Sequence, residues 1–193
     1  MGKKLAAAAA LAAILILTAC SGSSSEPTSA STSTGASTST TFDDHGVVFS
    51  YPSSWDPIPT EAKNVQAGTA SWETGVGVSP VDLVMVAEYP IKVSIDSKNI
   101  DKAAASITST ISDLFRQGGG TMESGPTSST MGGFPSLGFT GTIGTADGTQ
   151  VSSRVTLAFN GTTEYFVNCQ YTDAYQAEIS DGCDQIVSTF QTT

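Results

Sequence analysis

The sequence predicts one α+β domain in residues 42–193, because helical and strand periodicities alternate along this part of the chain. A length of 193 residues suits a single domain. Apolar residues recur at spacings of three and four in 100–115 and again in 175–190, which is typical of amphipathic helices. Residues 151–171 alternate in period two instead, as strands do.

The first half of the domain contains three expected strands, at 46–51, 65–72 and 81–87. The third is almost wholly apolar, which predicts a central strand that is buried on both faces. After an interruption at Pro90, residues 91–95 are expected to continue it.

The second half is expected to form a β-meander. Leu137, Phe139 and Ile143 alternate with small residues, and Asp147-Gly148 then predicts a turn. Further along, Asn160-Gly161 predicts a hairpin with a type I′ turn, because both residues accept a positive φ.

The two helices have different expected ends. Asn99 is a candidate N-cap for the first helix, and the glycines at 118–120 are expected to end it. In the last helix, Gly182 is expected to kink or split the apolar stripe.

The N-terminus has the pattern of a bacterial lipoprotein signal over residues 1–19. A short basic segment precedes an apolar run at 5–17, which spans about 20 Å as a helix and is too short to cross a hydrocarbon core of about 30 Å. The run ends in Leu17-Thr18-Ala19-Cys20, which resembles the lipobox, so Cys20 is expected to carry lipid, including acyl chains such as palmitate. The alternative is an ordinary signal peptide followed by an unrelated cysteine.

A Ser/Thr-rich stalk is expected to follow Cys20 and to extend to residue 41. Fifteen of the residues 21–41 are Ser or Thr and none is a large hydrophobe, so this segment cannot bury apolar surface. Removal of Lys3 and Lys4 with the signal leaves six basic and eighteen acidic residues, a net charge of −12. Such a surface excludes nucleic acid and repels anionic lipid, so membrane contact is expected through the lipid alone.

Two places in the domain carry a family resemblance, its opening and its closing stretch. Residues 46–55 (GVVFSYPSSW), together with 165–169 and 185–190, resemble the opening strand, last strand and final helix of the PsbP-like group, in particular its LpqN-like lipoproteins. The resemblance implies an antiparallel sheet with helices on both faces and roles in binding or assembly. It transfers no functional residue, because the matching positions are core positions.

No catalytic constellation is recognisable in the sequence. His45 is the one histidine and follows Asp43-Asp44; a solvated entry to the domain explains it better than a metal site, because neighbouring residues of an extended chain point apart. Trp55 is expected at the edge of the core, with ligand stacking as the alternative. Trp72 is left open between a core residue and an exposed contact.

The two remaining cysteines, Cys169 and Cys183, are expected to form a disulfide. Lipid occupies Cys20, which leaves an even pair in an oxidising compartment. Both sulfurs meet in one layer if the last helix folds back over the last strand. Two buried free thiols, or a reactive thiol, are the alternatives, although neither cysteine has a neighbouring cation or histidine that favours a thiolate.

These observations predict a non-enzymatic, lipid-anchored protein on the extracytoplasmic face of the cell membrane, with no cofactor or metal and with an envelope protein as partner. The runner-up is a carrier of a small apolar or lipid ligand in a cleft between sheet and helix. An apolar cavity lined by Ile107, Phe115, Val155 and Tyr165 would favour the carrier.

Overall fold

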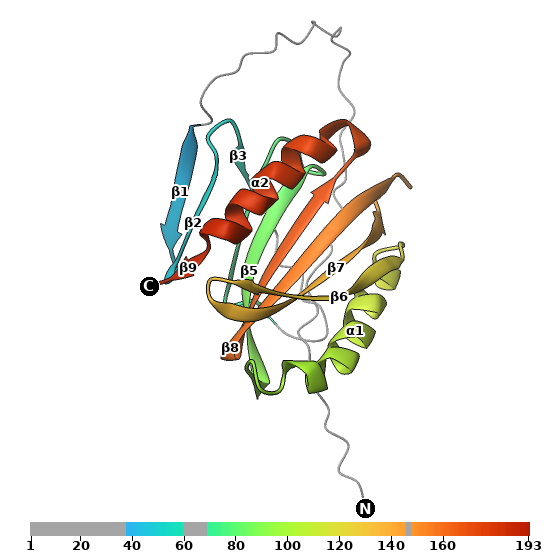
Figure 1. Cartoon of the computed structure of the whole chain (residues 1–193). Helices are drawn as coiled ribbons and strands as arrows, with labels where there is room; N and C mark the ends of the chain where they lie inside the picture. Colours follow the sequence, from blue (N-terminus) through green and yellow to red (C-terminus); the bar gives the residue numbers. More distant parts are fainter. Residues whose placement is uncertain (1–37, 60–68, 146–147) are drawn as a thin grey trace, which may run out of the picture.

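The computed structural model describes residues 38–59, 69–145 and 148–193 (Figure 1). Runs of strands are separated by two α-helices along these residues, so the predicted α+β class is confirmed. The first elements are β1 (Ser39–Asp44), β2 (Val47–Pro52), β3 (Asp56–Ile58), β4 (Trp72–Gly77), β5 (Leu83–Ile95) and α1 (Ile100–Gln117). They are followed by β6 (Met122–Met131), β7 (Phe134–Gly144), β8 (Gln150–Tyr171), a 3₁₀ turn (Asp173–Tyr175), α2 (Gln176–Thr189) and β9 (Gln191–Thr192).

The strands form two antiparallel sheets. The small sheet has the order β1-β2-β9, and the large sheet has the order β3-β4-β5-β8-β7-β6. The predicted central strand lies within β5, which continues past Pro90 to Ile95 with a register shift between these two residues. Of the strand expected at 65–72, residues 65–68 lie outside the described residues, and β4 begins at Trp72.

The long strand β8 folds back on itself at Asn160-Gly161. Its first half pairs with β7 and its second half with β5. The Ser153 hydroxyl lies 2.7 Å from Asn168 Oδ1, whereas fifteen residues of straight strand would separate them by roughly 50 Å. The predicted hairpin is therefore present, as Figure 1 shows. The predicted type I′ turn is wrong, because Gly161 has a positive φ of 64° but Asn160 does not.

Two positive φ values occur in the turn at His45-Gly46, where φ is 52° and 76°, and again at Gly132-Gly133, where φ is 61° and 81°. The His45-Gly46 turn joins β1 to β2, with Asp44 paired opposite Val47. Strand β1 was not expected from the sequence; it begins at Ser39, three residues before the expected domain start at 42. The stalk boundary is corrected accordingly: residues 39–41 are Ser and Thr, but they pair with β2 and belong to the domain.

Two layers of apolar side chains form the core, one on each face of the large sheet. Successive strand residues point to opposite faces, and in β5 Met85 belongs to the first layer while Val84 and Val86 belong to the second. Helix α1 contributes to the first layer through Ile107, Ile111, Leu114 and Phe115. Helix α2 contributes to the second layer through Ile179, Cys183 and Ile186.

The ends of α1 are where the sequence places them, but Asn99 does not cap the helix with its side chain. Asn99 Oδ1 instead accepts a hydrogen bond from the Asp96 amide, at 2.9 Å, and the Asn99 amide group donates to the Ser94 carbonyl. At the other end Gly119 has a φ of 74°, which is the left-handed backbone expected after a helix.

Helix α2 is continuous from Gln176 to Thr189, so the last helix is not split at Gly182. Gly182 serves packing instead. A Cβ atom at this position would overlap the six-membered ring of Trp55, which is 3% exposed beneath the helix. The glycine therefore lets the helix approach the tryptophan closely.

We expect Gly182→Ala to destabilise the domain by about 1–3 kcal/mol, because the ring of Trp55 must move. Urea unfolding measures the change. In a Trp55→Phe background the clash is relieved, and the same substitution should be neutral or should stabilise by about 1 kcal/mol through helix propensity. Equal effects in both backgrounds would contradict this explanation.

Candidate functional site

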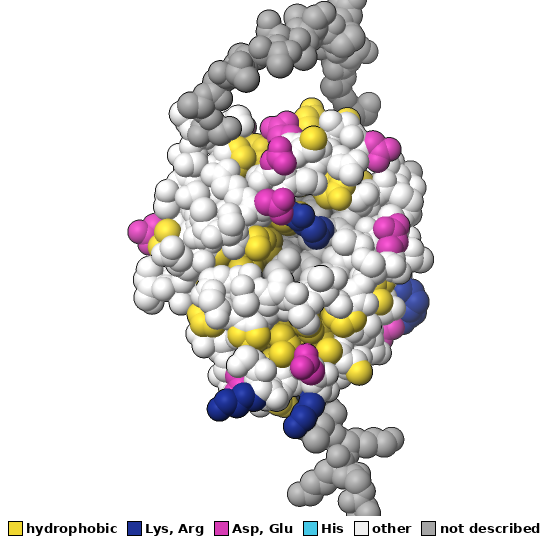
Figure 2. Space-filling view, viewed as in Figure 1, with side chains coloured by type: hydrophobic (Ala, Val, Ile, Leu, Met, Phe, Trp, Pro, Cys, Tyr) yellow, Lys and Arg dark blue, Asp and Glu magenta, His cyan; other side chains and the backbone are white. Residues whose placement is uncertain are grey.

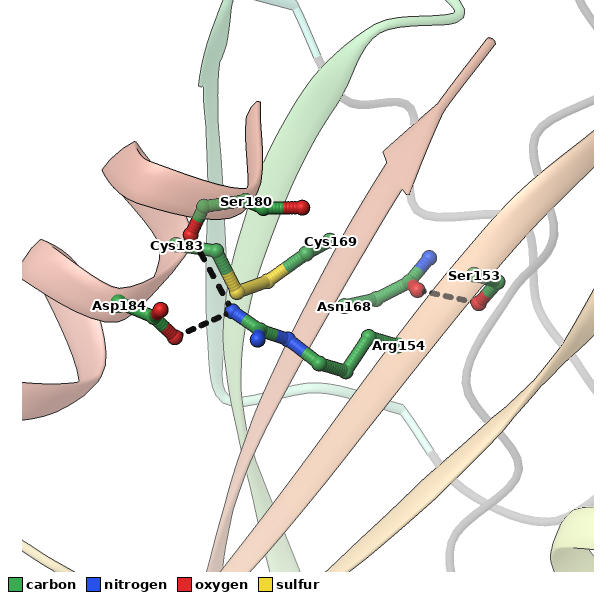
Figure 3. Close-up of a disulfide and its surroundings, with 7 residues drawn as sticks. All are labelled: Ser153, Arg154, Asn168, Cys169, Ser180, Cys183 and Asp184. Carbon is green, nitrogen blue, oxygen red and sulfur yellow. Dashed lines mark hydrogen bonds and ion pairs between the residues drawn. A yellow bond between two sulfur atoms is a disulfide. The ribbon is translucent and has the colours of Figure 1, made fainter. Parts of the chain in front are cut away.

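The sequence-predicted site residues lie in separate places. Cys20, the signal segment and the stalk up to residue 37 lie outside the described residues. Cys169 on β8 and Cys183 on α2 form a disulfide, as the sequence predicts, with Cα atoms 6.0 Å apart and both side chains buried. The bond joins the last helix to the sheet (Figure 3).

An ion pair lies beside the disulfide and holds the same helix. Arg154 Nη2 on β8 donates to Asp184 Oδ1 at 2.7 Å and to the Ser180 carbonyl at 3.4 Å. Figure 3 shows the guanidinium reaching across to α2 next to the two sulfurs. In the space-filling view, basic and acidic side chains meet at a shallow hollow beside α2 (Figure 2). These contacts hold α2 against the sheet, so the two buried cysteines have a structural role.

The two tryptophans are both buried. Trp55 donates from Nε1 to Glu178 Oε1 at 3.3 Å and lies at the edge of the core, as predicted. Trp72 is 9% exposed and donates to Glu88 Oε2 at 3.2 Å, so it is a core residue and not an exposed contact. The ring of His45 covers it, nearly parallel at 5.4 Å between centroids.

The four residues proposed to line an apolar cleft do not share one layer. Ile107, Phe115 and Val155 belong to the first layer, and Tyr165 belongs to the second, on the other face of the sheet. All four are at most 6% exposed. The prediction of a single cleft lined by these four residues is therefore wrong. The reason is strand alternation, since positions 155 and 165 lie on two paired halves of β8 and face opposite ways.

A polar cluster that the sequence analysis missed lies in the first layer, and we define it as Glu73, Tyr89 and Glu164. Tyr89 on β5 is the direct cross-strand neighbour of Glu164 on β8. Glu73 on β4 is paired with Ala87, two residues from Tyr89 and on the same face. The three side chains are thus neighbours across adjacent strands.

Tyr89 and Glu164 are buried, and Glu73 is half-buried. Glu164 is 2% exposed, and burial raises its pKa to about 8. Burial, and then the charges of Glu73 and Glu164, raise the pKa of the Tyr89 hydroxyl. Glu73 Oε1 is buried without a hydrogen-bond partner. Because buried polar atoms are nearly always paired, this cluster is the strongest candidate for a functional site in the described part of the chain.

The sequence indicates a buried polar cluster here only if both faces of β8 are known to be covered. Tyr165, Val167 and Cys169 alternate in period two and form one face of the strand, which leaves Glu164 on the other face. In the structure Phe166, on that same face, is 2% exposed. A carboxyl group beside it is therefore buried as well.

Comparisons with known proteins identify the fold. No family model matches the chain, and no curated protein matches its sequence. Cyanobacterial PsbP from Synechocystis sp. PCC 6803 matches in structure with a TM-score of 0.56 and 12% identity, covering 86% of this chain and 98% of that protein.

Two further solved structures have the same fold. LpqN of Mycobacterium tuberculosis, described as involved in cell envelope biogenesis, matches with a TM-score of 0.50 and 15% identity over 81% of this chain and 91% of LpqN. A Bacteroides thetaiotaomicron protein matches with a TM-score of 0.50 and 9% identity over 77% of this chain, which spans 45% of that protein. The chain therefore has the PsbP-like and LpqN-like fold that its sequence motifs resemble.

Proposed function

We propose that the chain is a lipid-anchored, non-catalytic binding protein of the bacterial cell envelope. The lipobox ending at Cys20 supports the anchor. The observation that carries the envelope role is the fold shared with LpqN, a protein described as involved in cell envelope biogenesis. Within the described residues, no helix is both long enough and apolar enough to cross a membrane.

The position of β1 supports a binding surface away from the lipid. The strand begins at Ser39, nineteen residues after Cys20. If the segment between them were a flexible stalk, as its composition predicts, it would reach roughly 25 Å. The strand ends at Asp44, about 17 Å further along the domain. The turn at His45-Gly46 and the C-terminal Thr193, whose amide donates to the Gly46 carbonyl, lie at this far end. Partners in the envelope would meet this end of the domain first.

We expect Cys20→Ala to abolish membrane retention, because lipidation requires the thiol and two acyl chains are needed for durable anchoring. Detergent phase partition of the wild-type and mutant proteins measures the change. Ser21→Ala is the matched control and should partition like the wild type. Full retention of the Cys20→Ala protein in the membrane fraction would overturn the lipoprotein assignment.

Crosslinking of the lipidated protein in its own cells, followed by mass spectrometry, tests the binding role. Stable protein partners support an assembly function, and co-purified lipid supports the carrier function. Recovery of neither, from cells in which the anchored protein is abundant, counts against a binding role.

The carrier alternative is favoured by one observation, the polar cluster. Beside the apolar first layer, Glu73 Oε1 is buried without a hydrogen-bond partner, and Tyr89 and Glu164 are each 2% exposed. A small ligand with a polar group satisfies such a site better than a purely apolar ligand does.

A further inference from the structure

We propose that β1 exchanges between two copies of this chain, so that β1 of each molecule pairs with β2 of the other. Such an exchange is an association of the chain with itself, and it requires neither the lipid anchor nor an envelope partner. Three features of the molecule point to it: the few contacts of β1, the apolar surface that β1 covers, and the turn that joins β1 to β2.

Strand β1 is held mainly by one strand and one side chain. It lies at the edge of the small sheet and, within the described residues, pairs with β2 alone. Five of its six residues are exposed, and the sixth, Phe42, is half-buried. The Phe42 ring stacks on Phe49 at 4.7 Å between centroids and lies 6.0 Å from the ring of Trp72. The strand can therefore leave while the large sheet stays intact.

The departure of β1 uncovers a surface that needs a strand. Phe49 on β2 is fully buried and loses the ring of Phe42, its direct cross-strand neighbour. The backbone groups along this edge of β2 lose their hydrogen-bond partners as well, which is unfavourable. A strand that pairs in the same register and carries an aromatic ring at the same position restores all of these contacts. The β1 strand of a second copy is such a strand.

The turn between β1 and β2 favours the exchange. His45 has a φ of 52° and is the one residue other than glycine with a positive φ in the described part of the chain. A Cβ atom makes this left-handed backbone unfavourable. In the exchanged form residues 45–46 run on as an extended hinge, so the strain is released. The contacts between β1 and β2 are the same in both forms, whereas the strained turn exists only in the closed one.

Charge opposes the exchange and makes it depend on salt. The pairing of Asp44 with Val47 continues through the opened turn, so the two hinges lie antiparallel and place the two Asp44 residues about 10 Å apart. Like charges at this distance repel across a Debye length of about 30 Å at 0.01 M salt, and much less across about 8 Å at 0.15 M. Exchange should therefore increase between these two salt concentrations.

Mixing of two cysteine variants tests the exchange. Thr41 on β1 lies directly opposite Ser50 on β2, and the Ser50 amide donates to Thr189, away from β1. The pair is therefore not hydrogen-bonded, and its Cα atoms lie about 4.5 Å apart, within the range for a disulfide. The full mature Thr41→Cys and Ser50→Cys proteins are incubated together in neutral detergent and then oxidised. We expect a covalent heterodimer joined through positions 41 and 50, detected by intact mass and by mapping of the linked peptides.

A matched pair of positions measures random collision. Ser124 on β6 and Thr140 on β7 are also direct cross-strand neighbours, with hydroxyl oxygens 2.7 Å apart, but the chain continues from both ends of β6 into other elements. We expect at least tenfold more heterodimer than from Ser124→Cys mixed with Thr140→Cys. Adding His45→Gly to both single variants should lower the yield severalfold, because glycine accepts the positive φ without strain.

The double variant Thr41→Cys/Ser50→Cys guards against a false negative. Oxidised in dilute solution, it should form the bond within one chain, which shows that the two positions can be joined. If it does so, and the mixed single variants yield no more heterodimer than the control pair, the strand does not exchange and the proposal is overturned. Failure of the double variant to close would show that β1 and β2 are not paired in this register, which overturns the proposal as well.

Discussion

Glu164→Gln will remove a large part of the pH dependence of folding stability. In the folded domain, burial raises the pKa of Glu164 from 4.5 to about 8. As the pH rises, the unfolded chain therefore ionises this group at a lower pH than the folded domain does. The contribution of Glu164 to folding stability is fully present below pH 4.5 and is lost as the pH rises towards 8. The loss is on the order of 5 kcal/mol. Glutamine does not titrate, so the variant lacks this loss.

Urea unfolding of both proteins at pH 5 and pH 8.5 measures the difference. We expect the free energy of unfolding of the glutamine variant, minus that of the wild type, to be several kcal/mol larger at pH 8.5 than at pH 5. Glu123→Gln is the matched control, because its side chain is exposed on β6 and its removal should change neither value by much. A difference between wild type and Glu164→Gln that is the same at both pH values would show that Glu164 ionises normally.

Removal of the disulfide will destabilise the domain by about 3 kcal/mol, as expected for a closed loop of about fifteen residues. For a domain of this size, the melting temperature should fall by roughly 9 °C in the Cys169→Ala/Cys183→Ala double variant. Arg154→Met is the matched control, since it removes the neighbouring ion pair to Asp184 and leaves the covalent link intact. That control should cost about 1 kcal/mol or less.

Intact mass after alkylation checks the bond itself. The folded, oxidised protein should take up no alkylating reagent at Cys169 or Cys183 until a reductant and a denaturant are added, because both side chains are buried. Reaction of both cysteines without reduction would show that the bridge is absent.

Elements with strong local periodicity could be predicted from the sequence. Helix α1 has the expected stripe of Ile107, Ile111 and Phe115, and its ends agree with the sequence. The hairpin in β8 was predictable from Asn160-Gly161, but the turn type was not, because pairing with β5 at Gly161 constrains the backbone there. Strand β1 was missed because its Ser and Thr residues have the composition of a stalk, and only pairing with β2 makes them a strand.

The candidate site depends on tertiary packing and was therefore not predictable. A carboxylate that alternates with apolar residues along a strand usually lies on the solvent face of the sheet. Glu164 is buried because both faces of β8 are covered. Gly182 lies within a continuous helix, where the absence of a side chain leaves room for Trp55. The disulfide was predictable because it needs only two residue positions and a helix that returns over its strand.

The attachment of the chain through β1 has a mechanical consequence. Tension transmitted from an anchor at Cys20 would act on Ser39, which is paired with Pro52 at the point where β2 leaves for the rest of the domain. The load and the restraint then act at the same end of an antiparallel pair, so the hydrogen bonds open one after another instead of resisting together. The tether can thus lengthen by about 20 Å as β1 peels away, while the large sheet stays intact.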